Sequence, residues 1–465
     1  MADVLTDNST DRRANAAVSA EPDLKSLRPP LWSALPRGGW PFAVGIGIAA
    51  LFYFVLQPAI GGFASNVLFV AGVNIILAVS LTAVNGFTGQ FSIGHAGFMS
   101  LGGYVAATII YYGSFRFFGG ADFHGGLLSW TGFREFEGPF FGSGDLLFLI
   151  ACLIAGVIAA AVGWLVGLPS LRLRGDYLAI VTLGFGEIVR VILQATPAQY
   201  FGSDAEKIAR MPLVKLSSHP LNDSLLTHMG GSLGFIYLPT YGTVFWVWTA
   251  VAITLVATVR LKRSSYGRAL LSVREDAVAA QAMGVDITRY KVRAFMFSAF
   301  FAGIAGALYA SQIGSINAGE FGFQKSFDIV IMVVLGGLGS VSGAALAAVI
   351  LTILPELLRD PPDLWPWGFV AAAVVAGLIL LLARKRKGPL IVLVVTCAVW
   401  EGGRWLAIGL KINLADYRMI IYALLLIVMM ILRPEGLFGV REIWDYVPAF
   451  WKRKRQPPPV LEGTA

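Results

Sequence analysis

The sequence predicts an all-α fold, a polytopic integral membrane bundle of about twelve transmembrane helices. Composition is the first reason: of 465 residues, 56% are hydrophobic and 14% are charged, whereas soluble domains have about 25% charged residues. The second reason is that apolar runs of about 17 to 25 residues recur along the chain, each long enough to cross about 30 Å of hydrocarbon as a helix. Because lipid cannot satisfy backbone polar groups, such spans must be helices.

The apolar runs place seven spans in the first two thirds of the chain and three or more beyond residue 326. The seven lie near residues 41–60, 63–84, 91–112, 146–168, 177–195, 242–260 and 292–313. The stretch 326–358 is interrupted by Gly-Gly-Leu-Gly-Ser at residues 336–340, which predicts a glycine-broken helical hairpin instead of a single span. In transporters, short discontinuous helices of this kind often lie near the pathway.

Basic residues orient the spans. When the spans are alternated, three basic regions fall on one side: the N-terminal tail, the turn with Arg172 and Arg174, and the region that begins at Arg260. The positive-inside rule makes this side cytoplasmic. A double crossing of 326–358 puts Arg384–Lys387 and the basic C-terminal end on the same side. Both termini are therefore expected in the cytoplasm.

Several classes of function are disfavoured. The net charge of +8 does not indicate nucleic-acid binding, because the basic residues lie in short loops and tails where membrane orientation demands them. Cys152 and Cys397 lie within apolar runs and are interpreted as small core residues, and the four histidines lack ligand spacing. The sequence has no Gly-x-x-x-x-Gly-Lys-Ser/Thr loop to hold a phosphate. We therefore expect no metal, no cofactor and no nucleic acid on this chain.

One segment, GRALLSVREDAVAAQAMGVDITRYK at residues 267–291, is a charged island between two apolar runs, with seven charged side chains in 25 residues. Its apolar and small residues favour one amphipathic helix that stops at Gly284. Such a helix is too short to span the membrane and too apolar on one face to lie free in water. Three uses are open: lying on the lipid surface, packing under its own bundle, or docking in a groove of another protein.

Part of the island resembles a known signature. The segment VAAQAMG, residues 278–284, is similar to the Glu-Ala-Ala-x-x-x-Gly signature of ABC-importer permeases. Ala279, Ala280 and Gly284 match the signature, and Val278 replaces its glutamate. In that family this loop forms the coupling helix, which lies in a cleft of the ATPase subunit. The resemblance thus places Ala280 at the ATPase surface.

Five blocks extend the resemblance over most of the chain, roughly residues 40–360 and 416–440. Together they resemble the branched-chain amino acid ABC permease family, in its LivM-like branch. In chain order, the blocks are NGFTGQFSIGHAGFMSLGGYVAA (85–107), LRLRGDYLAIVTLGFGEIVRVIL (171–193), GRALLSVREDAVAAQAMG (267–284), VVLGGLGSVSGA (333–344) and YRMIIYALLLIVMMILRPEGLFG (417–439).

The resemblance implies a transport subunit, not an enzyme: the transmembrane permease of an ATP-driven importer for leucine, isoleucine and valine, in the bacterial cytoplasmic (inner) membrane. It implies a LivH-like second permease, two cytosolic ABC ATPases, a periplasmic substrate-binding protein and membrane lipid as partners. ATP and magnesium would be bound by the ATPases. The residues assigned to coupling are Arg274, Glu275, Asp276, Ala279, Ala280 and Gly284.

On this basis the chain divides into five parts: a flexible cytosolic tail, a permease core, a two-span insertion, the last core helix and a basic cytosolic tail. These parts are residues 1–38, 39–360 with the coupling loop at 261–291, 361–415, 416–440 and 441–465. The insertion and the long N-terminal tail depart from the family pattern.

The sequence leaves alternative functions open. Permeases for urea and short amides share much of the family pattern, so the substrate is not settled by the resemblance. An autonomous ion-coupled secondary transporter is a second class, for which an intramembrane carboxylate such as Glu187 would be the support. A non-transporting membrane scaffold is a third class, supported only by the insertion.

Six polar residues are candidates for the substrate pathway: Asn85, Gln90, Ser92, His95, Thr182 and Glu187. Each has a structural alternative. The small residues around Ser92 also suit tight helix packing. His95 is better explained by a hydrogen bond in the bundle than by a ligand, and Glu187 by an ion pair with Arg190 three residues on.

We predict that Arg384–Lys387 is cytosolic. In a chain without Cys152 and Cys397, Arg386→Cys should resist a membrane-impermeant maleimide in intact cells and react after permeabilisation, because the double crossing of 326–358 turns this cluster inwards. Thr131→Cys, in the predicted outer loop 113–145, is the positive control. Ready labelling of residue 386 from outside would overturn the layout.

Overall fold

The computed structural model describes residues 31–130, 139–170, 176–209 and 228–357, together with Ile427 and Glu442. The chain forms two compact units, residues 1–44 and 45–465, and the packing and the sites described below lie within the second. Within the described residues the regular elements are helices, and the only β-structure is one isolated bridge between Phe235 and Ile316. The all-α fold is thus confirmed. The count of about twelve spans stays a prediction, because the insertion 361–415 and, apart from Ile427, the last core helix 416–440 lie outside the described residues.

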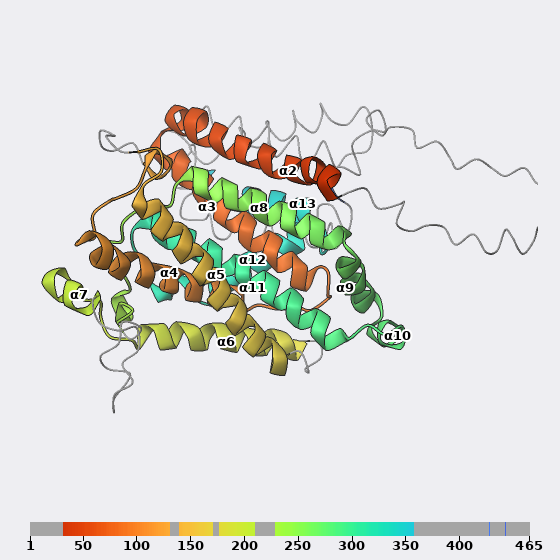
Figure 1. Cartoon of the computed structure of the whole chain (residues 1–465). Coiled ribbons are helices and arrows are strands. Elements are labelled where there is room, and N and C mark those ends of the chain that lie inside the picture. Colours follow the sequence, from red (N-terminus) through yellow and green to blue (C-terminus); the bar gives the residue numbers. More distant parts are fainter. Residues whose placement is uncertain are drawn as a thin grey trace, which may run out of the picture. The chain divides into compact units, whose positions relative to one another are not determined.

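The helices follow one another as a bundle (Figure 1). The first half of the chain contains α2 (Leu31–Leu51), η1 (Phe52–Leu56), α3 (Gln57–Asn85), α4 (His95–Phe118), η2 (Leu127–Ser129), α5 (Ser143–Ser170), α6 (Asp176–Gln194) and α7 (Gly202–Ala209). The second half contains η3 (Gly231–Leu233), α8 (Val244–Arg263), α9 (Ser265–Glu275), α10 (Ala277–Ala282), α11 (Ile287–Ile313), η4 (Ala318–Phe321), α12 (Phe323–Gly336) and α13 (Val341–Leu357).

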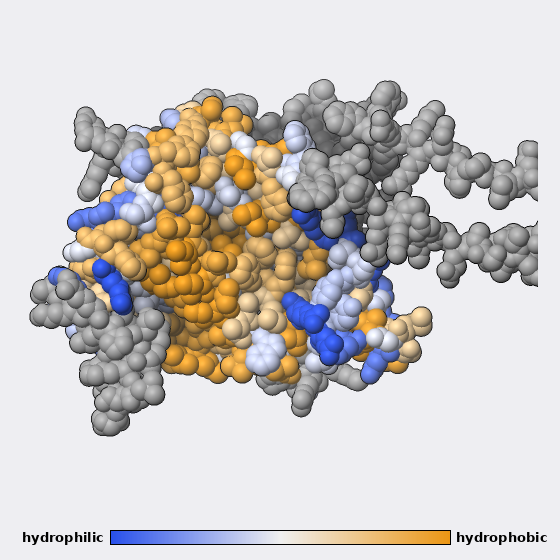
Figure 2. All heavy atoms as spheres, viewed as in Figure 1, coloured by the Kyte–Doolittle hydropathy of each residue, from blue (hydrophilic) through white to orange (hydrophobic). Residues whose placement is uncertain are grey.

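Five stretches of the described chain are long and apolar enough to cross a membrane. They are Gly39–Asn85, Ser143–Leu168, Tyr177–Gln194, Val244–Arg263 and Ile287–Ile313. The chain is therefore a multi-pass membrane protein. Figure 2 shows apolar residues over most of the viewed face of the helices, with hydrophilic residues towards both of its ends, one of which lies beside α9 and α10.

The structure refines three of the predicted boundaries. Helix α2 already begins at Leu31, so residues 31–38 are helical although the sequence placed them in the tail. The first two predicted spans meet at Gly61, whose φ of 74° breaks the helix where the sequence separated them. The predicted span 91–112 begins later, at His95, because residues 86–94 form a non-helical link, here called the α3–α4 connection.

Helices α3, α4, α5 and α11 pack together as the core of the bundle. Glycines bring the backbones of these helices close. A Cβ on Gly102 would overlap the backbone of Gly303, and one on Gly306 would overlap the backbone of Met99 and Gly103. The small residues after Ser92 therefore allow tight packing of neighbouring helices, which is the structural role that the sequence offered as the alternative to a pathway role.

The predicted glycine-broken hairpin is present. Helix α12 ends at Gly336 and α13 begins at Val341, so residues 337–340 form a turn, here called the α12–α13 turn. Gly337 and Gly339 have φ of 110° and 105°, which other residues rarely adopt. Gly336 and Gly343 lie so close that neither has room for a side chain. The stretch 326–357 is therefore a pair of packed helices, not one span.

We predict that Gly306→Ala lowers the thermal unfolding midpoint of the detergent-purified chain. The added methyl group has no space, and overpacking of this kind costs about 1–3 kcal/mol. Gly184→Ala is the matched control, because a Cβ at this helical glycine meets nothing within 4 Å. The control should leave the midpoint unchanged or raise it, since alanine favours the helix. Equal shifts for both variants would contradict the packing argument.

Candidate functional site

The charged island forms two short helices, α9 and α10, before the first turn of α11, and not the one continuous helix up to Gly284 that the sequence suggested. Asp276 ends α9 and begins α10, with its side chain accepting hydrogen bonds from the backbone N–H groups of Val278 at 2.8 Å and Ala279 at 3.0 Å. A short carboxylate competes in this way with the backbone and so favours a helix start over a helix interior. The sequence signal for this break was Asp276 itself, within an otherwise helix-forming run.

The predicted helix stop at Gly284 is confirmed. Gly284 has a φ of 84°, and its N–H donates to the carbonyl of Gln281 at 3.0 Å. The N–H of Val285 donates to the carbonyl of Ala280 at 3.1 Å. These two bonds form the Schellman arrangement that satisfies the last carbonyls of a helix, and the left-handed glycine permits it.

The island packs on the bundle through α9 and presents α10 outwards. On α9, Leu270 and Val273 are buried, and the ring of Tyr266 stacks on that of Tyr290 in α11, with centroids 4.5 Å apart. On α10 and its end, Val278 is 76% exposed and Met283 is 84% exposed. In Figure 1, α9 and α10 lie beyond the ends of α8 and α11, at the end of the bundle away from α7.

The six residues predicted for coupling do not share one surface. Glu275, Asp276, Ala279 and Gly284 are exposed. Ala280 is only 5% exposed because it packs against its own chain, so an arginine at this position would disturb the permease itself. The Arg274 side chain is turned inwards and is 24% exposed, whereas that of the neighbouring Glu275 is 79% exposed.

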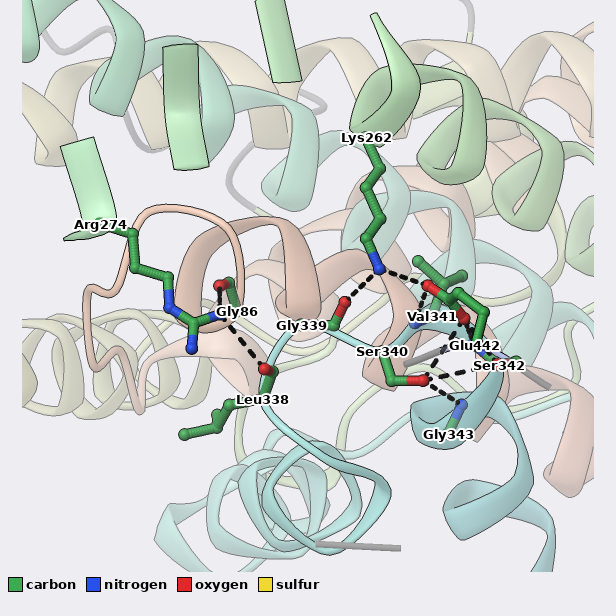
Figure 3. A network of polar contacts seen from close by, with 10 residues as sticks. All are labelled: Gly86, Lys262, Arg274, Leu338, Gly339, Ser340, Val341, Ser342, Gly343 and Glu442. Atoms are coloured by element: carbon green, nitrogen blue, oxygen red, sulfur yellow. Dashed lines mark hydrogen bonds and ion pairs between the residues drawn. The ribbon is translucent and has the colours of Figure 1, made fainter. Parts of the chain in front are cut away.

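Arg274 bonds to two backbone carbonyls of the bundle (Figure 3). Its Nη1 donates to the carbonyl of Gly86 at 2.8 Å and to that of Leu338 at 3.2 Å. Its aliphatic stem lies against Gly89, where a Cβ would come within 3.2 Å of it. Arg274 therefore touches both the α3–α4 connection and the α12–α13 turn.

The α12–α13 turn is also held from the other side, by Glu442 and Lys262 (Figure 3). The Glu442 carboxylate accepts from the N–H groups of Val341 at 3.1 Å and Ser342 at 2.9 Å, and from the Ser342 hydroxyl at 2.6 Å. Lys262, at the end of α8, pairs with Glu442 at 2.5 Å and donates to the carbonyl of Gly339 at 2.6 Å. A carboxylate at a helix N-terminus is favoured by the helix dipole.

Burial and hydrogen bonding act in opposite directions on Glu442. Burial raises the pKa of its carboxyl, but the hydrogen bonds from Lys262 and Ser342 and the charge of Lys262 lower it more, so the pKa lies below the ordinary value. The carboxylate thus stays charged at neutral pH. Sequence reasoning missed Glu442, because a residue in a basic tail gives no sign of a partner 100 residues earlier.

Five of the six pathway candidates meet along the α3–α4 connection, and all five are buried. The Asn85 amide oxygen accepts from the N–H of Ser92 at 3.1 Å, and Gln90 accepts from the hydroxyl of Thr88. The N–H of Ile93 donates to the hydroxyl of Thr182 at 3.1 Å. These side chains therefore hold a non-helical segment in place within the bundle.

His95 opens α4 directly after this connection. Its Nε2 lies 3.0 Å from the hydroxyl of Ser80 in α3. The hydrogen bond within the bundle, which was the structural alternative, is what the structure shows.

Glu187, the sixth candidate, lies apart from the other five. Its carboxylate accepts from Arg190 Nε at 2.7 Å, so the ion-pair alternative is the one that the structure shows. The same carboxylate accepts from the N–H of Phe323 at 3.0 Å, at the first residue of α12. Both helices of the hairpin thus begin at a carboxylate from a distant part of the chain.

Sequence reasoning also missed a polar contact that joins α12, α3 and α13. Lys325 Nζ donates to the amide oxygen of Asn74 at 3.2 Å, and the amide nitrogen of Asn74 donates to the hydroxyl of Thr352 at 2.8 Å. The sequence signal for this contact was the lysine beside a predicted span, because burying a charge near the membrane interior costs free energy unless the charge has a polar partner.

We predict that Glu442→Gln destabilises the purified chain by about 1–3 kcal/mol, because Lys262 loses its charged partner and one backbone N–H group loses a good acceptor. Thermal unfolding at neutral pH measures the loss. Glu275→Gln is the control, since Glu275 is exposed and 3.9 Å from Arg274, and exposed pairs contribute little.

The stability difference between wild type and Glu442→Gln should also depend on pH. A carboxyl whose pKa is lowered by folding stabilises the protein fully above its ordinary pKa of 4.5, and this contribution declines below 4.5 and is lost as the pH falls through the lower pKa of the folded protein. The difference between wild type and Glu442→Gln should therefore shrink on acidification. A difference that is the same at pH 7 and pH 4 would contradict the assigned role of Glu442.

Comparison with known proteins agrees with this architecture. Residues 63–383 match the family described as branched-chain amino acid transport system / permease component. The high-affinity branched-chain amino acid transport system permease protein LivM of Salmonella typhimurium is 37% identical over 296 residues, which cover 62% of this chain and 61% of that protein. The protein of the same name from Escherichia coli is 36% identical over the same shares.

A second class of relative is more distant. The permease protein LivH of the same Salmonella typhimurium system is 26% identical over 283 residues, which cover 61% of this chain and 80% of that protein. No solved structure matches the chain. This chain spans about 61% of the length of the LivM relatives. The match over residues 63–383 nevertheless shows that the chain belongs to the family of branched-chain amino acid transport system permease components.

Proposed function

We propose that this chain is the transmembrane permease subunit of an ATP-driven ABC importer for branched-chain amino acids. It would lie in the bacterial inner membrane, with both termini in the cytoplasm. The observation that carries the proposal is the family match over residues 63–383. The geometry of the charged island adds support, because α10 and its end carry apolar side chains, Val278 and Met283, that no described part of the chain covers.

The proposed complex has four kinds of component around this chain: a LivH-like permease, two ABC ATPases, a periplasmic binding protein and membrane lipid. ATP and magnesium are bound by the ATPases. The exposed apolar side of α10 is the surface proposed to enter a cleft of one ATPase, and this makes the third use of the island, docking on a partner, the favoured one. The buried face of α9 provides the connection to the bundle.

A branched-chain amino acid combines two charged groups with an apolar side chain. Its passage needs a largely apolar conduit with few polar contacts, because tight binding at the midplane slows release. The core formed by α3, α4, α5 and α11 is apolar and glycine-rich. Affinity and specificity are therefore assigned mainly to the binding protein.

The alternative functions are less well supported. Urea and short amides remain the alternative substrates within the family. For an ion-coupled secondary transporter, Glu187 was the main argument, and its carboxylate is engaged by Arg190 and the start of α12. Uptake of labelled leucine by the reconstituted complex, in competition with isoleucine, valine, urea and acetamide, tests the substrate class. Uptake by this chain alone under an ion gradient would favour the secondary transporter instead.

We predict that Met283→Asp weakens ATPase retention without reducing the amount of chain in the membrane. A charge on an apolar contact at the centre of an interface costs about 2 kcal/mol or more, which corresponds to about thirtyfold or more in affinity. Co-purification of the ATPases with the tagged chain measures the effect. Thr288→Asp, an exposed position at the start of α11, is the control. Equal ATPase retention for Met283→Asp and wild type would show that α10 is not part of the interface.

A further inference from the structure

Three separate segments meet at Arg274. The guanidinium group comes from α9, and the two carbonyls that it binds come from the α3–α4 connection and the α12–α13 turn. The last two segments also touch each other, because a Cβ on Gly86 would lie 2.8 Å from the backbone nitrogen of Gly339. The contacts in Figure 3 thus join one exposed element to two segments within the bundle.

The two carbonyls belong to places where a helix is interrupted. Gly86 directly follows the last residue of α3, and Leu338 lies in the turn between α12 and α13. Loop and element-terminal residues can absorb the backbone changes of a hinge movement, whereas the interior of a helix would lose its hydrogen bonds. Arginine suits this position because its planar group can direct several N–H donors at different acceptors at once.

The α12–α13 turn and the α3–α4 connection each lead to another part of the bundle. Glu442 joins the α12–α13 turn to the start of α13, because it accepts from the Ser340 hydroxyl and from the first N–H groups of α13. Lys262 joins the turn to the end of α8. A displacement of Leu338 is therefore passed on to α13. The α3–α4 connection carries Gln90 and Ser92, two of the pathway candidates, which are buried.

We infer that Arg274 is the positioning residue through which a movement of α9 is passed to the α3–α4 connection and the α12–α13 turn. It holds these two segments to the α9–α10 unit so that the three move as one body. Arg274 thus faces the permease, and it is α10 that faces the ATPase. The inference rests on the proposed function, since it assumes that an ATPase moves the island.

A purely structural role makes a different prediction. If Arg274 only stabilises the fold, Arg274→Ala lowers the amount of complex, and the surviving complex couples normally. If Arg274 carries the movement, the complex still assembles, because Val278 and Met283 are untouched, and it hydrolyses ATP without matching transport. The ratio of transport to hydrolysis separates the two.

The experiment uses the full complex, with both permeases, the ATPases and the binding protein, in proteoliposomes. For Arg274→Ala, we expect normal ATPase retention and ATP hydrolysis, with at least about a fivefold fall in leucine taken up per ATP hydrolysed, the lower end of usual coupling between sites. Arg274→Lys should lie between, because lysine keeps the charge and the donors but has a shorter side chain without the planar guanidinium group. Arg268→Ala removes the same charge from an exposed position on α9 and should match wild type.

A second measurement follows the movement directly and does not depend on the substrate. Spin labels are placed at Ser272→Cys on α9 and Leu338→Cys in the turn, in a chain without other cysteines. With Arg274 present, their separation should stay the same between the nucleotide-free and the vanadate-trapped complex. In Arg274→Ala the separation should shift or broaden on trapping, because the two segments no longer move together.

The outcomes are distinct. In Arg274→Ala, unchanged uptake per ATP or an unchanged label separation on trapping overturns the inference and leaves the proposed function intact. A separation that changes on trapping with Arg274 present also overturns it. Loss of ATPase retention in Arg274→Ala also overturns it, because Arg274 would then act at the docking surface. Failure of the wild-type chain to retain any ATPase would instead contradict the proposed function.

Discussion

Lipid offers no hydrogen bonds, so every interruption of a helix inside this bundle must find its partners within the protein. The described chain has two such interruptions on the side of the charged island, the α3–α4 connection and the α12–α13 turn. Both are satisfied by side chains from elsewhere. Asn85 and Thr182 hold the connection, and Arg274 takes the carbonyls of Gly86 and Leu338. These irregular segments exist because the polar side chains reach them.

The same constraint explains where the charged residues lie. Glu187 accepts from the first N–H of α12, with Arg190 beside it, and Glu442 accepts from the first N–H groups of α13, with Lys262 beside it. Each carboxylate satisfies groups that a helix start leaves unpaired, and each is neutralised by a base. The helix starts of the hairpin can therefore lie against an apolar bundle, because their unpaired N–H groups have acceptors.

Close packing supplies the rest of the stability. Where water is absent, helices associate through van der Waals contact, and glycines such as Gly102, Gly303 and Gly306 let backbones approach. This packing is rigid, and so a movement imposed at the island has to enter the bundle where helices are broken. Arg274 contacts both of these places, which relates the rigid core to the proposed transport cycle.

The sequence alone determined the class of the protein and most of its helices. Length and composition of the apolar runs sufficed, because crossing a membrane leaves a helix as the only solution for such a segment. Local chemistry also predicted the break at residues 336–340 and the stop at Gly284, since glycine conformations depend on nearby residues. The tertiary structure alone decided which way each side chain faces. Arg274 and Ala280 turn inwards and Glu442 reaches α13, because these contacts join residues far apart in the chain, and their energy depends on burial and distance that no local pattern records.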